Sequence, residues 1–139
     1  MHFSFKIENY NDLIQYGIVL SIKMHRIPKQ TPIPCVYVIT CPEWKMYDGR
    51  RFFKIGRTIH PNERLKQLKD HFNRSNLKYK YLLRTQIDDE SRIEKLLHRK
   101  FKRYQVEDED SVELFAVDTI TLRNALWCLE EKGDVELLI

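Results

Sequence analysis

Residues 52–68 read FFKIGRTIHPNERLKQL and pass from a strand pattern to a helix pattern. The first part belongs to RFFKIGRT, residues 51–58, which is typical of a strand. Pro61 then stands where the first turn of a helix tolerates proline. Leu65, Leu68 and Phe72 follow at helical spacing, so the sequence predicts a helix over 61–72.

Two further strands are predicted on either side of this segment. CVYVIT at 35–40 is β-branched and aromatic, and with 51–58 it predicts an antiparallel hairpin whose long connection turns at Asp48-Gly49. NLKYKYLLRTQ at 76–86 predicts the third strand. The prolines of KQTPIP break any preceding helix. We therefore expect an N-terminal extension over 1–33 and one domain over 34–139.

The C-terminal part predicts two more helices. Asp88 and Asp89 open the first, whose apolar positions are Ile93, Leu96, Leu97 and Phe101. VELFAV at 112–117 predicts a short strand or extended segment, and Asp118 is expected to cap a last helix that stops at Gly133. VELLI follows as a candidate edge strand. The expected fold class is α+β, with a three-stranded, largely antiparallel sheet flanked by helices.

The composition indicates an intracellular globular domain. The 139 residues are 42% hydrophobic and 32% charged, which argues against disorder. No apolar run is long enough to span a bilayer, and the start lacks the apolar core of a signal peptide. The cysteines at 35, 41 and 128 are odd in number and fit neither a metal knuckle nor a disulfide framework. We expect reduced thiols and no membrane partner.

Positive charge is concentrated in the middle of the chain. Residues 50–84 hold eleven Lys or Arg against two acids, whereas residues 107–118 hold six acids and no basic residue. A concentrated positive segment favours a polyanion, because neutralised phosphates release condensed counterions. The alternative is a basic face that meets only solvent.

Five side chains stand out by their order along the chain: Tyr37, Lys54, Arg64, Glu94 and His98. Taken singly, each has an ordinary structural interpretation, such as a half-buried strand aromatic or an i, i+4 helix pair. Together they resemble the GIY-YIG nuclease superfamily. The resemblance rests on VYVI at 36–39, KIG at 54–56, an arginine in the next helix and E-x-x-x-H in a later one. It spans about 34–117 and is closest to a branch common in phages and large DNA viruses.

The resemblance implies a divalent-metal-dependent endonuclease, a hydrolase that cleaves DNA phosphodiester bonds. Tyr37 would be the general base or its relay, Lys54 would help to lower its pKa, and Arg64 would clamp the scissile phosphate. Glu94 would hold one Mg²⁺ or Mn²⁺ per site, and His98 would orient Glu94 or pass a proton. Further phosphate or nucleic-acid contacts are expected from Arg57, Arg50, Arg51 and Lys66.

Three departures from the broader family keep other functions open. Lys54 stands where a tyrosine is usual, and Leu68 stands where a histidine is frequent. The usual terminal asparagine has no clear counterpart, and Gln105 is the nearest candidate. One alternative is a catalytically weak or inactive DNA-binding module of the same fold, and another is a protein-interaction factor. DNA is the expected partner. Because one such site nicks one strand at a time, a homodimer is a possible form. For a viral protein, the expected compartment is the cytoplasm or nucleus of the host cell.

Overall fold

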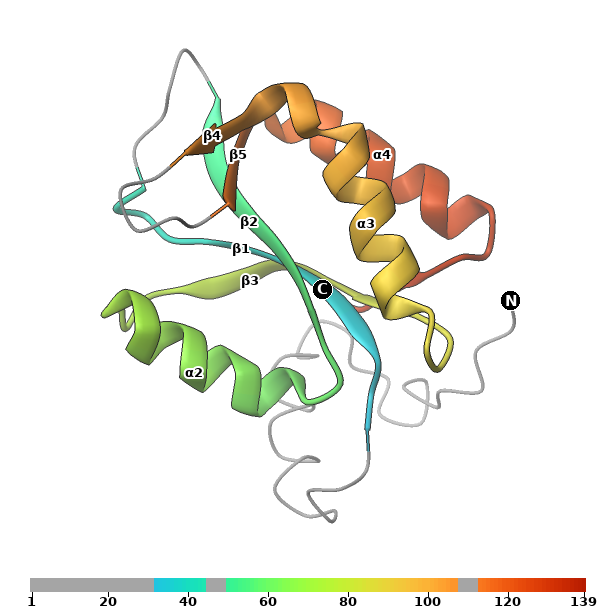
Figure 1. Ribbon diagram of the computed structural model, residues 1–139, viewed down its shortest axis with the longest axis horizontal. Coiled ribbons are helices and arrows are strands. Elements are labelled where there is room, and N and C mark those ends of the chain that lie inside the picture. Colours follow the sequence, from blue (N-terminus) through green and yellow to red (C-terminus); the bar gives the residue numbers. More distant parts are fainter. Residues whose placement is uncertain (1–31, 45–49, 108–112) are drawn as a thin grey trace.

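The computed structural model describes residues 32–44, 50–107 and 113–139, which build a mixed α+β domain (Figure 1). The strands of this part are β1 (Cys35–Thr40), β2 (Arg51–Thr58), β3 (Lys78–Arg84), β4 (Gln105–Glu107), β5 (Glu113–Val117) and β6 (Glu136–Leu137). The helices are α2 (Pro61–Phe72), α3 (Glu90–Lys100) and α4 (Thr119–Glu131), with a 3₁₀ turn, η3 (Lys102–Tyr104), after α3. Most of the predicted extension and the predicted turn at Asp48-Gly49 lie outside the described residues.

The strands form one sheet in the order β4-β5-β2-β1-β3-β6, and every neighbouring pair is antiparallel. The predicted class and the predicted hairpin are confirmed, but the count of three strands is too low. The three predicted strands are the centre of a six-stranded sheet. The two outermost strands, β4 and β6, have three and two residues, too few to show an alternating pattern.

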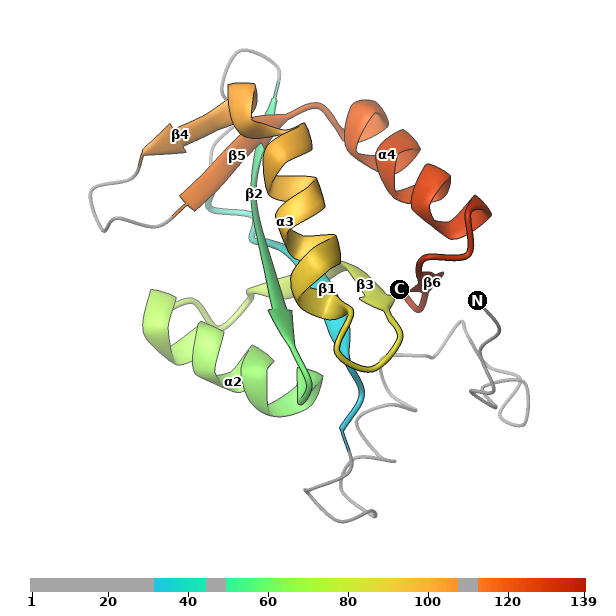
Figure 2. The ribbon, with the colours of Figure 1, turned by 45° about the vertical axis from the view of Figure 1, so that its right-hand side comes forward.

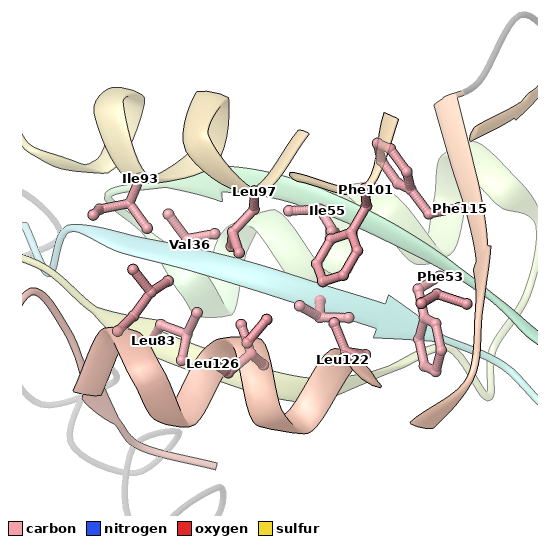
Figure 3. Close-up of a cluster of buried hydrophobic side chains, with 14 of the residues drawn as sticks. Val36, Phe53, Ile55, Leu83, Ile93, Leu97, Phe101, Phe115, Leu122 and Leu126 are labelled. Atoms are coloured by element: carbon pink, nitrogen blue, oxygen red, sulfur yellow. The ribbon is translucent and has the colours of Figure 1, made fainter. Parts of the chain in front are cut away.

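Alternation along β1 sends side chains to two separate cores. Val36 and Val38 face the larger core, which α3 and α4 cover, whereas Tyr37 and Ile39 face a smaller core beside α2. Figure 3 shows Ile93 and the other side chains of α3 and α4 meeting those of the sheet in the larger core. Helices α2 and α3 therefore lie on opposite faces of the sheet (Figure 2).

The helix ends follow the signals in the sequence closely. α2 begins at Pro61 and ends at Phe72, as predicted. α4 is capped by Asp118, whose carboxylate accepts from the Thr121 backbone N–H at 2.8 Å, and Gly133 adopts a φ of 80° just beyond its end. Asp89 occupies the N-cap position of α3, but its carboxylate pairs with Arg92. None of these helices, in the part of the chain described, has the length and apolarity needed to cross a membrane.

Candidate active site

The C-terminal half of β2 is open along one edge. β5 pairs only with Arg51–Phe53 of β2, so within the described residues β1 is the only strand that pairs with the segment from Lys54 to Thr58. This open edge runs between α2 on one face of the sheet and α3 on the other (Figures 1 and 2). Side chains from both faces can therefore meet around it.

Gly56 lets an aromatic side chain reach this edge. It lies opposite Tyr37 across β1 and β2. A Cβ on Gly56 would stand 2.9 Å from Cε1 of Tyr37, and closer still to Cζ and the hydroxyl. The ring therefore lies directly over the glycine, and the tyrosine is only 1% exposed.

Arg64, from the first turns of α2, reaches the same hydroxyl. Its Nε donates to Tyr37 Oη at 3.4 Å, and its Nη1 donates to Gln67 Oε1 at 3.2 Å. Because arginine can only donate, the phenol oxygen accepts here, and the phenol keeps its own hydrogen for another acceptor. The 3.4 Å separation makes this a weak hydrogen bond.

Glu94 approaches the edge from α3. Its Oε1 lies 3.3 Å from Nε of Arg57, the penultimate residue of β2. The Arg57 side chain is 49% exposed and the Glu94 side chain 21% exposed, so solvent screens this ion pair. The two residues predicted to contact phosphate and metal thus contact each other.

Charged side chains from both faces of the sheet affect the pKa of Tyr37. Burial raises the pKa of the phenol above its ordinary value, and the hydrogen bond and charge of Arg64 partly oppose that rise. The negative charge of Glu94 raises this pKa further, although α3 packs on the other face. Tyr37, Arg64 and Glu94 therefore share one electrostatic environment around the open edge.

His98 supplies a donor to the unpaired strand edge. Its Nε2 lies 2.8 Å from the carbonyl oxygen of Ile55, and its ring packs edge-on against Phe115 with centroids 5.1 Å apart. Because a carbonyl only accepts, Nε2 must carry the hydrogen. These contacts hold α3 against β2, while the predicted role of orienting Glu94 or passing a proton stays a prediction.

The remaining predicted residues lie at different distances from this edge. Lys54 is half-buried and two residues from Gly56, so alternation places it on the same face as Gly56, beside α2. Lys66 is exposed on α2. Arg51 begins β2 and Arg50 directly precedes it, so both lie more than about 15 Å along the strand from Gly56. The structure therefore does not bring these two arginines to the open edge.

Tyr79 is a second phenol at the site that the sequence analysis did not single out. Its hydroxyl donates to the Pro61 carbonyl oxygen at 2.6 Å, and its ring centroid lies 5.6 Å from that of Tyr37. Burial raises the pKa of this phenol as well. The contact ties β3 to the first turn of α2, which carries Arg64. Alternation in KYKY, residues 78–81, was the available signal.

The family model of the T5orf172 domain matches residues 34–130. The chain belongs to the T5orf172 domain family. This phage-derived domain is associated with GIY-YIG and HNH-like nucleases, which fits the phage-like resemblance read from the sequence. No curated protein and no solved structure matches the chain significantly. The matched range contains Tyr37, Arg64 and Glu94, and the family agrees with a nuclease or DNA-binding role.

The donor set of this T5orf172 domain suits only a cation that keeps most of its water ligands. Among the described residues, no three His, Cys, Asp or Glu side chains gather into a metal-binding group. Glu94 is a single carboxylate, and its partner Arg57 already balances its charge. Mg²⁺ is usually held by one or two carboxylates together with waters and substrate phosphate, so Glu94 would be its protein ligand.

Proposed function

We propose that this T5orf172 domain hydrolyses DNA phosphodiester bonds with Mg²⁺ or Mn²⁺ bound at Glu94. One observation carries the proposal: at the open edge of β2, Arg64 bonds the Tyr37 hydroxyl at 3.4 Å, and the charge of Glu94 acts on the same phenol. Phosphodiester hydrolysis needs a cationic clamp, a proton-transfer group and a means to stabilise charge. These three side chains supply one each.

Arg64 is the phosphate clamp in this proposal. Its planar guanidinium matches two oxygens of a phosphate, and both of its present contacts are neutral groups. Exchanging the weak 3.4 Å contact with the phenol for a charged phosphate oxygen is favourable, because charge-assisted hydrogen bonds are stronger. That exchange also frees the covered Tyr37 hydroxyl for the reacting groups.

Tyr37 is the proton-transfer group in this proposal. In the free protein its raised pKa keeps the phenol protonated at neutral pH, so it is a hydrogen donor in that state. Neutralising the charge at Glu94 removes one cause of the raised pKa and moves the phenol toward use as a base. Glu94 would hold the divalent cation, which would supply positive charge near the phosphate and the water.

A second candidate function is DNA binding without cleavage. The Arg57–Glu94 ion pair favours it, because that arginine occupies the carboxylate that a metal needs. Leu68 favours it too, since this residue packs into the small core where the broader family often has a histidine. The third alternative, a protein-interaction factor, would use the acidic tract at 107–113 to mimic nucleic acid or to cover the site, and most of this tract lies outside the described residues.

Plasmid nicking separates the first two functions. We expect the wild-type protein to nick supercoiled DNA with Mg²⁺ or Mn²⁺ and not with EDTA. Glu94→Gln should lower the nicking rate at least about 100-fold, while duplex affinity stays within about twofold of wild type. Glu131→Gln, which removes an exposed carboxylate at the end of α4, is the matched control and should nick normally.

The other outcomes are equally decisive. Normal nicking by the Glu94→Gln protein would falsify the metal assignment. A wild-type protein that binds duplex DNA but cleaves it with neither cation establishes the binding module instead. Arg64→Ala should then weaken affinity without any effect on strand integrity.

A further inference from the structure

Four basic residues form an exposed row along α3 and η3: Lys95, Arg99, Lys102 and Arg103. We call them the α3 basic strip. They follow the segment richest in positive charge, residues 50–84, and none of them is part of the site at the β2 edge. All four side chains are exposed.

The strip lies next to the site on the surface of the same helix. Lys95 directly follows Glu94, and Arg99 directly follows His98. Each step along a helix turns about 100°, so the two basic residues stand one row further from the buried side, which Leu97 marks. A ligand that reaches Glu94 therefore meets the strip on its way past α3.

No acidic side chain balances the strip within the described residues. The ion pairs found there join Arg57 to Glu94, and Arg92 to both Asp89 and Asp134. Arg92, one turn earlier on α3, thus has two carboxylates, whereas the strip has none. Like charges at i, i+4, such as Lys95 and Arg99, repel each other and destabilise a helix slightly. An external polyanion relieves that repulsion.

The far end of the strip converges with Arg50, the residue just before β2. The guanidinium carbons of Arg103 and Arg50 lie 4.9 and 5.2 Å from the centre of the Tyr104 ring. Arg103 Nη2 also donates to the Tyr104 hydroxyl at 2.9 Å. One ring thus holds two guanidinium groups from separate elements near one point, although like charges repel. Two positive charges, those of Arg50 and Arg103, therefore lie close together at this end of the strip.

We propose that the α3 basic strip, together with Arg50, binds the sugar-phosphate backbone of the duplex DNA that flanks the cleaved phosphate. The proposal rests on the proposed function, because it treats the strip as the continuation of that site. Lys95 to Lys102 spans about 10 Å along the helix axis, which is close to three phosphates of one strand. The DNA then leaves the site from Glu94 toward η3.

The salt dependence of binding tests this path. Each phosphate contact contributes about 0.9 to the slope of log affinity against log salt. The variant Lys95→Gln/Arg99→Gln should therefore lower that slope by about two units, measured by fluorescence anisotropy with a labelled duplex in EDTA. Arg123→Gln/Lys132→Gln, at exposed positions on α4 and at its C-cap, removes the same charge and should keep the wild-type slope. Circular dichroism checks that both variants are folded.

The nicking assay separates failure of this inference from failure of the proposed function. At saturating DNA, the Lys95→Gln/Arg99→Gln protein should nick at the wild-type maximal rate and need only more DNA to reach it. An unchanged slope in this variant overturns the proposed DNA contact of the strip even if nicking is intact. An equal fall in the α4 control also overturns it, because net charge alone would then govern affinity. A lower slope in a protein that never nicks supports the strip and refutes the nuclease.

Discussion

Gly56 and Tyr37 stand opposite each other on β2 and β1, and the phenol ring occupies the space where a side chain on residue 56 would lie. The glycine is required here for its size. Its backbone is not left-handed, whereas Gly133, just beyond α4, has a φ of 80°. The lack of a side chain at residue 56, in the KIG motif of β2, thus lets the Tyr37 ring reach the open edge.

Gly56→Ala should therefore be destabilising. We expect the free energy of unfolding to fall by about 1–3 kcal/mol, the usual cost of overpacking, as measured by urea denaturation. In a Tyr37→Ala background the same change should be neutral or stabilising, because alanine is better than glycine in a strand once the ring is gone. An equal loss in both backgrounds would show that atoms other than the Tyr37 ring require the glycine.

Stability should fall in alkaline solution. Burial raises the pKa of the Cys35 thiol and of the Tyr37 and Tyr79 phenols, so the folded chain keeps protons that the unfolded chain releases near pH 9 and 10. The free energy of unfolding should lose none of this contribution below about pH 9 and should decrease steadily above that value. Urea denaturation between pH 7 and pH 11 measures the change.

Variants that lack one phenol each identify which tyrosine causes the loss of stability in alkaline solution. Tyr37→Phe and Tyr79→Phe should each make the decrease above pH 10 shallower, because one buried group no longer has to ionise on unfolding. A stability profile that stays level to pH 11 in the wild-type protein refutes the burial argument.

Local pattern was enough to predict the elements that carry the site. Strand-type composition indicated β1 and β2 with their observed ends, and Pro61 marked the start of α2. These signals act within a few residues, so a single sequence displays them. The candidate edge strand in VELLI is confirmed as β6, but the same reasoning missed β4, because a strand of three residues exists only through pairing with a neighbour.

Local sequence patterns could not predict which site residues contact one another. Arg57 and Glu94 were each assigned a ligand, yet they contact each other, because α3 packs beside β2 in the folded chain. Tyr79 reaches the Pro61 carbonyl only because β3 lies next to β1 and near the start of α2. Such pairings follow from sheet order, which no local pattern in this chain specifies.

Arg57 should compete with a divalent cation for Glu94. An exposed ion pair contributes about 0.2–1 kcal/mol, so Arg57→Gln should tighten Mn²⁺ binding to the free protein by up to about fivefold. Isothermal titration calorimetry without DNA measures this affinity. Glu94→Gln should abolish the binding, and Arg99→Gln, which removes an exposed arginine further along α3, should leave it close to the wild-type value. Weaker Mn²⁺ binding in the Arg57→Gln protein contradicts the competition.

His98 offers a test that separates holding the strand edge from moving a proton. His98→Ala leaves the Ile55 carbonyl without its donor and should lower the free energy of unfolding by about 1–3 kcal/mol. His98→Gln keeps an N–H donor of similar reach, so it should restore much of that stability.

If the histidine only positions α3, the glutamine variant should also recover nicking, measured at a temperature where all proteins are folded. If the imidazole transfers a proton, stability returns while nicking stays about 100-fold low, because an amide does not titrate near neutral pH. Full stability in His98→Ala contradicts the edge contact itself.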